Sequence, residues 1–140
     1  MSNKTLLLAA HGSSKHEGNN PILRLAEILH EQNLFGEVLC GFLRQKPFLR
    51  NVLSQIQTQE LSVIPMFSGF GYITETLIPQ ALSQINNKIR VHLYDPIGVH
   101  AEIPVIMAKR AFSIIDENAL DLAQVSVLVV AHGHTKNTKN

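Results

Sequence analysis

A histidine and a glycine follow the first apolar run of the chain, and the histidine side chain could take part in chemistry there. His11 and Gly12 come directly after the run 6–10. Glycine allows a tight turn, and an imidazole that titrates near neutral pH can accept a proton or bind a divalent metal. A buried histidine that only hydrogen-bonds its own turn is the alternative. Because the same pattern recurs at His132, we predict that His11 is a catalytic residue and a metal ligand.

Segments rich in polar residues, glycine or proline follow each of the predicted strands that come before a helix, at 11–19, 44–47, 68–74 and 95–100. In an open parallel sheet, ligands bind beyond the carboxyl ends of the strands. Three of these segments lead into helix N-termini, which favour anions. We therefore predict a carboxylate-rich ligand. The predicted substrate-binding residues are Ser13, Ser14, Arg44, Ser68, Gly69, Tyr72 and Thr74.

His100 follows the turn 95–98 and should stand at the start of a helix on the same edge of the sheet. We predict it as a second metal ligand, because a neutral imidazole binds divalent metals. The alternative is a surface residue that caps the helix.

The apolar pattern along the chain predicts the elements that position these residues. Short apolar runs predict strands at 6–10, 37–43, 61–66 and 89–94. Apolar residues at helical spacing predict helices within 22–29, 48–56, 77–85 and 103–115. Alternating strands and helices form βαβ units with a parallel sheet covered on both faces. The predicted fold is a doubly wound α/β domain with a four-stranded parallel sheet.

The end of the chain repeats its beginning. The segment 127–136 matches the segment 6–15 residue for residue, with identities at leucine, alanine, histidine, glycine and lysine. We therefore predict one α/β domain over residues 1–118. Residues 119–140 would be a linker and the truncated start of a second homologous domain, with 125–131 as an extra C-terminal strand.

Composition limits the classes of partner and compartment. The chain has 140 residues, is 45% hydrophobic and carries a formal net charge of +1, with scattered basic residues. This argues against nucleic acid as a partner, because a phosphate-binding face shows a basic stripe. The first apolar run is too short for a signal sequence or a membrane span. A single cysteine, Cys40, fits a reducing compartment, so we expect a cytoplasmic protein without a membrane partner.

Three motifs together resemble the sirohydrochlorin cobaltochelatases and ferrochelatases, which are ATP-independent class II chelatases. They are Leu8–Ser14, Pro65–Tyr72 with Pro79, and Asp95–His100. The resemblance implies insertion of Co²⁺ or Fe²⁺ (Ni²⁺ in some members) into sirohydrochlorin or a related tetrapyrrole, in cobalamin or siroheme biosynthesis. It implies no cofactor beyond the substrate metal ion. Family members are short homodimers or long chains with two such domains, and the internal repeat points to the long form.

One position departs from this family pattern. Family members place two histidines across the cleft, where they remove pyrrole protons or deliver metal; His11 matches the first. The second normally comes two residues after the glycine that Gly71 matches, and here that residue is Ile73. Three explanations remain open. The other half of the protein carries the paired histidine, a nearby group substitutes, or this half only shapes the pocket. The substitutes considered are Glu75, His100 and His92, although His92 is expected to be buried in the fourth strand.

The alternative function is therefore a non-catalytic tetrapyrrole-binding or metal-binding half of a tandem chelatase. A hydrolase or transferase on a flavodoxin-like scaffold is disfavoured. The sequence contains no nucleophile elbow, phosphate loop or dinucleotide-binding glycine motif.

Overall fold

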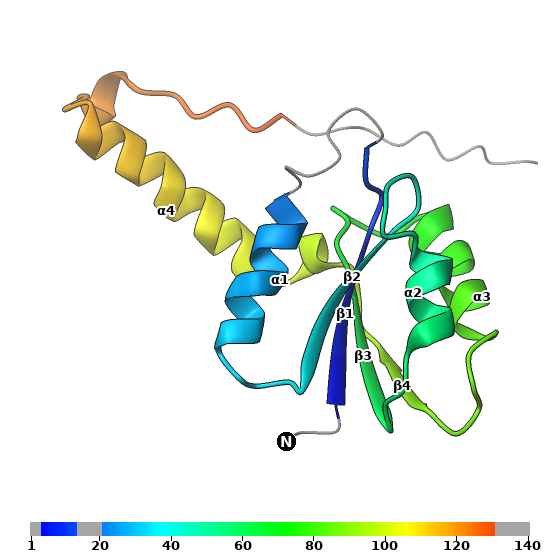
Figure 1. Cartoon of the computed structure of the whole chain (residues 1–140). Helices are drawn as coiled ribbons and strands as arrows, with labels where there is room; N and C mark the ends of the chain where they lie inside the picture. Colours follow the sequence, from blue (N-terminus) through cyan, green and yellow to red (C-terminus); the bar gives the residue numbers. More distant parts are fainter. Residues whose placement is uncertain (1–3, 14–20, 131–140) are drawn as a thin grey trace, which may run out of the picture. The chain divides into compact units, whose positions relative to one another are not determined.

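Four parallel strands form one sheet in the order β2-β1-β3-β4 in the computed structural model, which describes residues 4–13 and 21–130 (Figure 1). The strands are β1 (Lys4–Ala10), β2 (Glu37–Phe42), β3 (Glu60–Pro65) and β4 (Arg90–Leu93). This confirms the predicted doubly wound α/β fold, and each strand lies within about two residues of its predicted position.

The central strand β1 is apolar because both of its faces are covered. Side chains alternate between the two faces of a strand. Leu7 and Ala9 belong to one core cluster, while Leu6, Leu8 and Ala10 belong to the other. The unbroken apolar run of β1 is typical of a parallel strand inside a sheet with helices on both sides.

Helices cover both faces of the sheet. Helix α1 (Pro21–Glu31) packs on the cluster that includes Leu8, and α2 (Leu49–Gln55) and α3 (Ile78–Leu82) pack on the cluster that includes Leu7 (Figure 1). A π-helical turn, η1 (Ile73–Leu77), leads directly into α3. Pro79 is the second residue of α3, directly after the π-helical turn. A 3-10 turn, η2 (Ile97–Val99), follows β4.

The chain divides into two compact units, Met1–His100 and Ala101–Asn140. The described part of the second unit contains helix α4 (Glu102–Glu117) and a 3-10 turn, η3 (Leu122–Gln124). No described helix combines the length and the apolarity needed to span a membrane.

The segment predicted as an extra C-terminal strand differs from the prediction. Residues 125–130 belong to no β-ladder in the structure, and most of their side chains are exposed. A strand is held by hydrogen bonds to neighbouring strands, and the sheet of the described residues consists of β1 to β4. Residue 131, together with the repeated histidine His132, lies outside the described residues.

Candidate functional site

Two loops at the carboxyl end of the sheet are fastened to each other by backbone hydrogen bonds. The N–H of Leu43 donates to the carbonyl of Ala10 at 3.1 Å, and the N–H of Arg44 donates to the carbonyl of His11 at 2.9 Å. The pairing of β1 with β2 therefore continues past the ends of both strands. It holds the loop with His11 against the loop with Arg44.

His11 is exposed and lies directly after β1, at the edge where the sequence predicts it. Its Nδ1 lies 2.9 Å from the carbonyl oxygen of Gly12. A carbonyl oxygen only accepts hydrogen bonds, so Nδ1 carries the proton in this arrangement and Nε2 carries the lone pair. Nε2 is then the atom that can accept a proton or bind a metal ion.

Gly12 is required by the backbone at this turn. Its φ is +72°, in the left-handed region that side chains disfavour. A Cβ at this position would lie 2.7 Å from Cβ of Gln45 and 3.0 Å from Cβ of Phe42. The loop after β1 therefore reaches the loop after β2 only with glycine here.

Two further loops meet at the carboxyl ends of β3 and β4. The N–H of Gly98 donates to the carbonyl of Phe67 at 2.9 Å. A Cβ at Gly98 would lie only 2.4 Å from Cα and the carbonyl oxygen of Ser68. The two motif segments 65–72 and 95–100, which are far apart in the sequence, therefore touch through their backbones.

The predicted substrate-binding residues differ in accessibility. Ser13, Arg44 and Ser68 are exposed and Gly69 is half-buried, while Tyr72 is 67% exposed. Ser14 lies outside the described residues. These described residues come from three loops at the carboxyl edge of the sheet.

Thr74 occupies a different environment, since it is buried and its hydroxyl is used within its own turn. That hydroxyl accepts a hydrogen bond from the N–H of Gly71 at 2.9 Å and lies 3.1 Å from the carbonyl of Gly71. In this structure Thr74 shapes the loop that carries Tyr72.

Ile73, at the position of the family's second histidine, is half-buried and packs against the core cluster that contains Leu7 and Ile78. Glu75 in the same turn is exposed at the carboxyl edge. His92 was expected to be buried, and this expectation is wrong. Its side chain is 44% exposed, with Nε2 3.3 Å from a carboxylate oxygen of Glu60. β4 is an edge strand, and Glu60 is the first residue of β3, at the end of that strand opposite the loops of the site.

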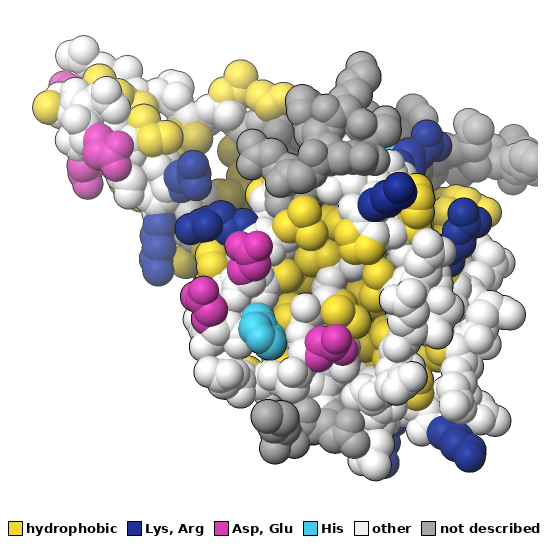
Figure 2. All heavy atoms as spheres, in the orientation of Figure 1, with side chains coloured by type: hydrophobic (Ala, Val, Ile, Leu, Met, Phe, Trp, Pro, Cys, Tyr) yellow, Lys and Arg dark blue, Asp and Glu magenta, His cyan; other side chains and the backbone are white. Residues whose placement is uncertain are grey.

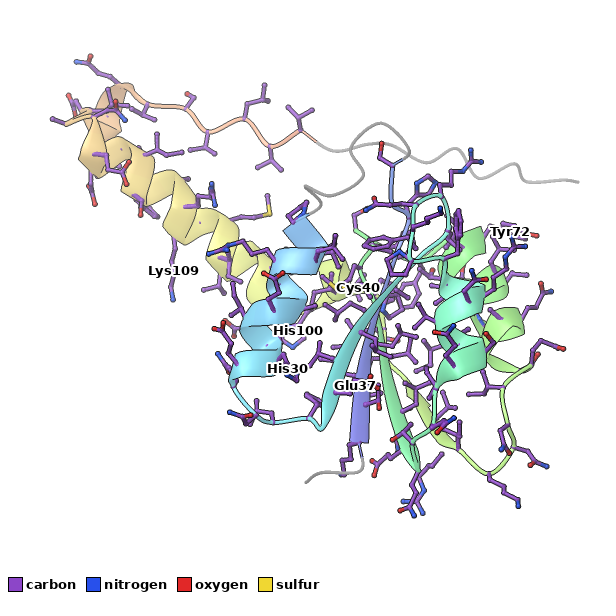
Figure 3. All side chains as sticks on the ribbon, in the orientation of Figure 1. His30, Glu37, Cys40, Tyr72, His100 and Lys109 are labelled. Atoms are coloured by element: carbon purple, nitrogen blue, oxygen red, sulfur yellow. The ribbon has the colours of Figure 1, made fainter. Side chains whose placement is uncertain are left out.

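His100 follows η2 and is exposed. In the sequence, His100 comes after β4 and His11 comes after β1. In the sheet, β3 lies between these two strands. In Figure 3, His100 lies on the side of α1 and Tyr72 on the side of α3. Over residues 4–13 and 21–130, no group of three or more histidine, cysteine or carboxylate side chains is arranged to hold a metal ion.

A groove of about 740 Å³ lies along β2 and reaches Pro47 in the loop after that strand. Figure 2 shows its apolar surface bordered by acidic and histidine side chains, and Figure 3 labels His30, Glu37 and Cys40 there. Burial raises the pKa of the Cys40 thiol to about 11, so this cysteine is protonated at neutral pH. It is not an activated nucleophile.

Sequence reasoning missed one residue of the site, Gln45. It lies in the loop after β2 and is only 1% exposed. Its side-chain oxygen accepts a hydrogen bond from the N–H of Ser13 at 3.1 Å. No sequence signal marks it, because a glutamine between Arg44 and Lys46 has the pattern of a solvated loop.

A parallel sheet of this order, with a histidine and a glycine at the carboxyl end of its central strand, defines an α/β domain of the chelatase-like class. The chain belongs to the CbiX family, whose profile matches residues 5–114. It is 26% identical, over an alignment 157 positions long, to a protein of Halobacterium salinarum named "Probable sirohydrochlorin cobaltochelatase". That alignment covers 96% of this chain and 53% of the relative, so the chain spans about half the length of the curated relative.

Solved structures support the same fold. A multi-domain protein of Deinococcus radiodurans, described as structurally similar to chelatases, is 29% identical with a TM-score of 0.69. The match covers 79% of this chain and 28% of that protein. A CbiX described as the terminal enzyme of siroheme biosynthesis in denitrifying bacteria is 23% identical with a TM-score of 0.65. It is matched over 80% of this chain and 48% of its own.

Proposed function

We propose that this domain takes part in the insertion of Co²⁺ or Fe²⁺ into sirohydrochlorin or a related tetrapyrrole, in cobalamin or siroheme biosynthesis. The observation that carries the proposal is the placement of His11. Its Nδ1 is bonded to the carbonyl of Gly12, so Nε2 is the ring nitrogen that remains for the reaction at the carboxyl edge of the sheet. Membership of the CbiX family and the name of the Halobacterium relative support the same reaction.

The chemistry requires a base and a loosely held metal. Insertion replaces two pyrrole N–H protons with one divalent ion, so two protons leave for each ion bound. Nε2 of His11 accepts a pyrrole proton and passes it to water, or holds the ion briefly before transfer. The metal ion is a substrate here, and the proposal includes no further cofactor. The proposed compartment is the cytoplasm.

The loops around His11 suit a substrate rich in carboxylates. Arg44 and Lys46 are exposed on the loop that is bonded to the His11 loop. A guanidinium group binds a carboxylate through paired, charge-assisted hydrogen bonds. Ser13 and Ser68 would add neutral hydrogen bonds from neighbouring loops, with Gly69 and Tyr72 completing the surface.

A second candidate function is non-catalytic binding of a tetrapyrrole or metal by one half of a tandem chelatase. Ile73 favours this candidate, because an apolar side chain packed against the core supplies no second base. His11 would then contribute to a cleft whose other histidine comes from another domain.

We also propose that a second copy of this fold covers α4 and the segment that follows it. Most of the exposed large apolar side chains of the described chain lie between residues 105 and 130. An apolar groove of about 670 Å³ separates α4 from residues 127–130. Exposed apolar surface of this extent marks a protein interface. The repeat of 6–15 at 127–136 favours a second copy supplied by a longer chain; a second molecule is the other source. Light scattering on residues 1–140 distinguishes these two sources of the second copy. A stable dimer is expected only if a second molecule covers the surface.

Absorbance spectroscopy tests the activity. Co²⁺ is added to sirohydrochlorin with the wild-type chain, with His11→Ala, and with His30→Ala as a matched control. His30 is an exposed histidine on α1, beside the groove at β2 and outside the proposed site. We expect His11→Ala to lower the insertion rate by about 10²-fold or more, with no loss for His30→Ala. Equal rates for the His11 variant and wild type would remove His11 from the reaction. Absence of tetrapyrrole binding by the wild-type chain would refute the chelatase function and would leave only metal binding from the second candidate.

A further inference from the structure

A single peptide group links Gln45 to His11. The N–H of Ser13 and the carbonyl of Gly12 belong to the same peptide group. The N–H donates to Oε1 of Gln45 at 3.1 Å, and the carbonyl accepts from Nδ1 of His11 at 2.9 Å. A trans peptide is planar, with its N–H and its carbonyl pointing in opposite directions. Gln45 and His11 therefore stand at the two ends of one continuous row of hydrogen bonds.

The Gln45 end of this row is held firmly. Gln45 is 1% exposed, and its Cβ lies close against Gly12. The neighbouring residue Arg44 donates its N–H to the carbonyl of His11 at 2.9 Å, which fixes the same loop from the other side. Hydrogen bonds shielded from water are stronger, and bonds in a row polarise one another.

The orientation of the Gly12–Ser13 peptide needs such support. Glycine has access to more backbone conformations than other residues, so a peptide that follows Gly12 can rotate unless another group holds it. A rotated peptide would turn the carbonyl away from Nδ1 of His11. The side-chain oxygen of Gln45 opposes that rotation by holding the N–H at the opposite side of the peptide.

We propose that Gln45 is a positioning residue that keeps His11 in the tautomer with the proton on Nδ1 and the lone pair on Nε2. The inference rests on the proposed function, in which Nε2 receives the pyrrole proton or holds the metal. Partners that orient a histidine in this way raise its basicity and fix its ring. Gln45 itself touches neither substrate nor metal in this role.

Three variants test the proposal, with the tautomer of His11 read from its ring ¹⁵N chemical shifts at alkaline pH. Gln45→Met keeps the approximate size of the side chain and removes the acceptor. Gln45→Glu keeps an oxygen acceptor at the same distance along the side chain. Thr5→Val is the control. Thr5 is a buried polar residue of β1, at the end of that strand far from His11.

We expect the Nδ1–H tautomer in the wild type, in Gln45→Glu and in Thr5→Val. We expect Gln45→Met to lose it and to insert metal about 10- to 100-fold more slowly, mainly through kcat. An Nε2–H tautomer in the wild-type chain would overturn the proposal even when Gln45→Met does not fold. An unchanged tautomer in folded Gln45→Met would also overturn it. Should the tautomer respond as expected while the wild type inserts no metal, the positioning role stands and the proposed catalytic function fails.

Discussion

Gly98 is the position where one added methyl group should most clearly disturb the site. A Cβ at this residue would lie 2.4 Å from Cα and the carbonyl oxygen of Ser68 and 2.5 Å from its carbonyl carbon. Carbon atoms in favourable contact are about 3.5–4.0 Å apart, so one of the two loops must move by about 1 Å. All three contacted atoms belong to the backbone, so no side-chain rotation can relieve the overlap.

The cost of Gly98→Ala follows from two effects. Overpacking of this kind costs about 1–3 kcal/mol. Separating the loops also strains the hydrogen bond from Gly98 to Phe67, which contributes about 1 kcal/mol. We expect the free energy of unfolding to fall by about 2–4 kcal/mol, a large share of the roughly 5–15 kcal/mol that stabilises a typical domain. For a chain of this length, the Tm should fall by about 10 °C.

Thermal and urea unfolding measure this loss directly. Gly69→Ala is the matched control, because it lies on the facing loop and an added Cβ there meets no atom within 4 Å. If the free energy of unfolding of Gly98→Ala lay within about 0.5 kcal/mol of the wild-type value, the contact between the loops after β3 and β4 would be refuted.

Two further predictions concern Cys40 and Ile73. Because burial raises the pKa of the Cys40 thiol from 9.0 to about 11, the unfolded thiol ionises first as the pH rises. The folded chain should therefore lose up to about 2 kcal/mol of stability between these two pH values. Urea unfolding of wild type and Cys40→Ala across this range isolates the effect, and parallel curves would contradict it. We expect Ile73→His to raise the rate of Co²⁺ or Fe²⁺ insertion once a second half or a second molecule closes the pocket. It should cost about 1–2 kcal/mol of stability, because Ile73 packs against the core. Ile73→Ser loses the same packing without adding a base, so equal insertion rates for the two variants would count against the gain.

The elements were predictable because their signals are local. The apolar run of β1 and the helical spacing of apolar residues in α1 depend only on which side chains each element must bury. The position of His11 was predictable as well, since it directly follows a strand whose carboxyl end had to lie at the carboxyl edge of the parallel sheet, and its role in a site stays a prediction. The extra strand was not predicted correctly, because an apolar run by itself does not show whether a segment pairs with another strand, and residues 125–130 form no strand among the described residues.

The sequence by itself therefore determined the order of strands and helices, the parallel sheet and the edge on which His11 stands. Tertiary structure alone decided how that edge is organised. Gln45 is almost completely buried and accepts a hydrogen bond from Ser13. Gly98 lies against the backbone of Ser68. Both contacts join residues that are far apart in the chain. Such contacts leave no periodic pattern, because they depend on where loops from different strands meet. The contact between Nδ1 of His11 and the Gly12 carbonyl depends on that meeting, since the carbonyl must be turned towards the ring before it can accept a hydrogen bond.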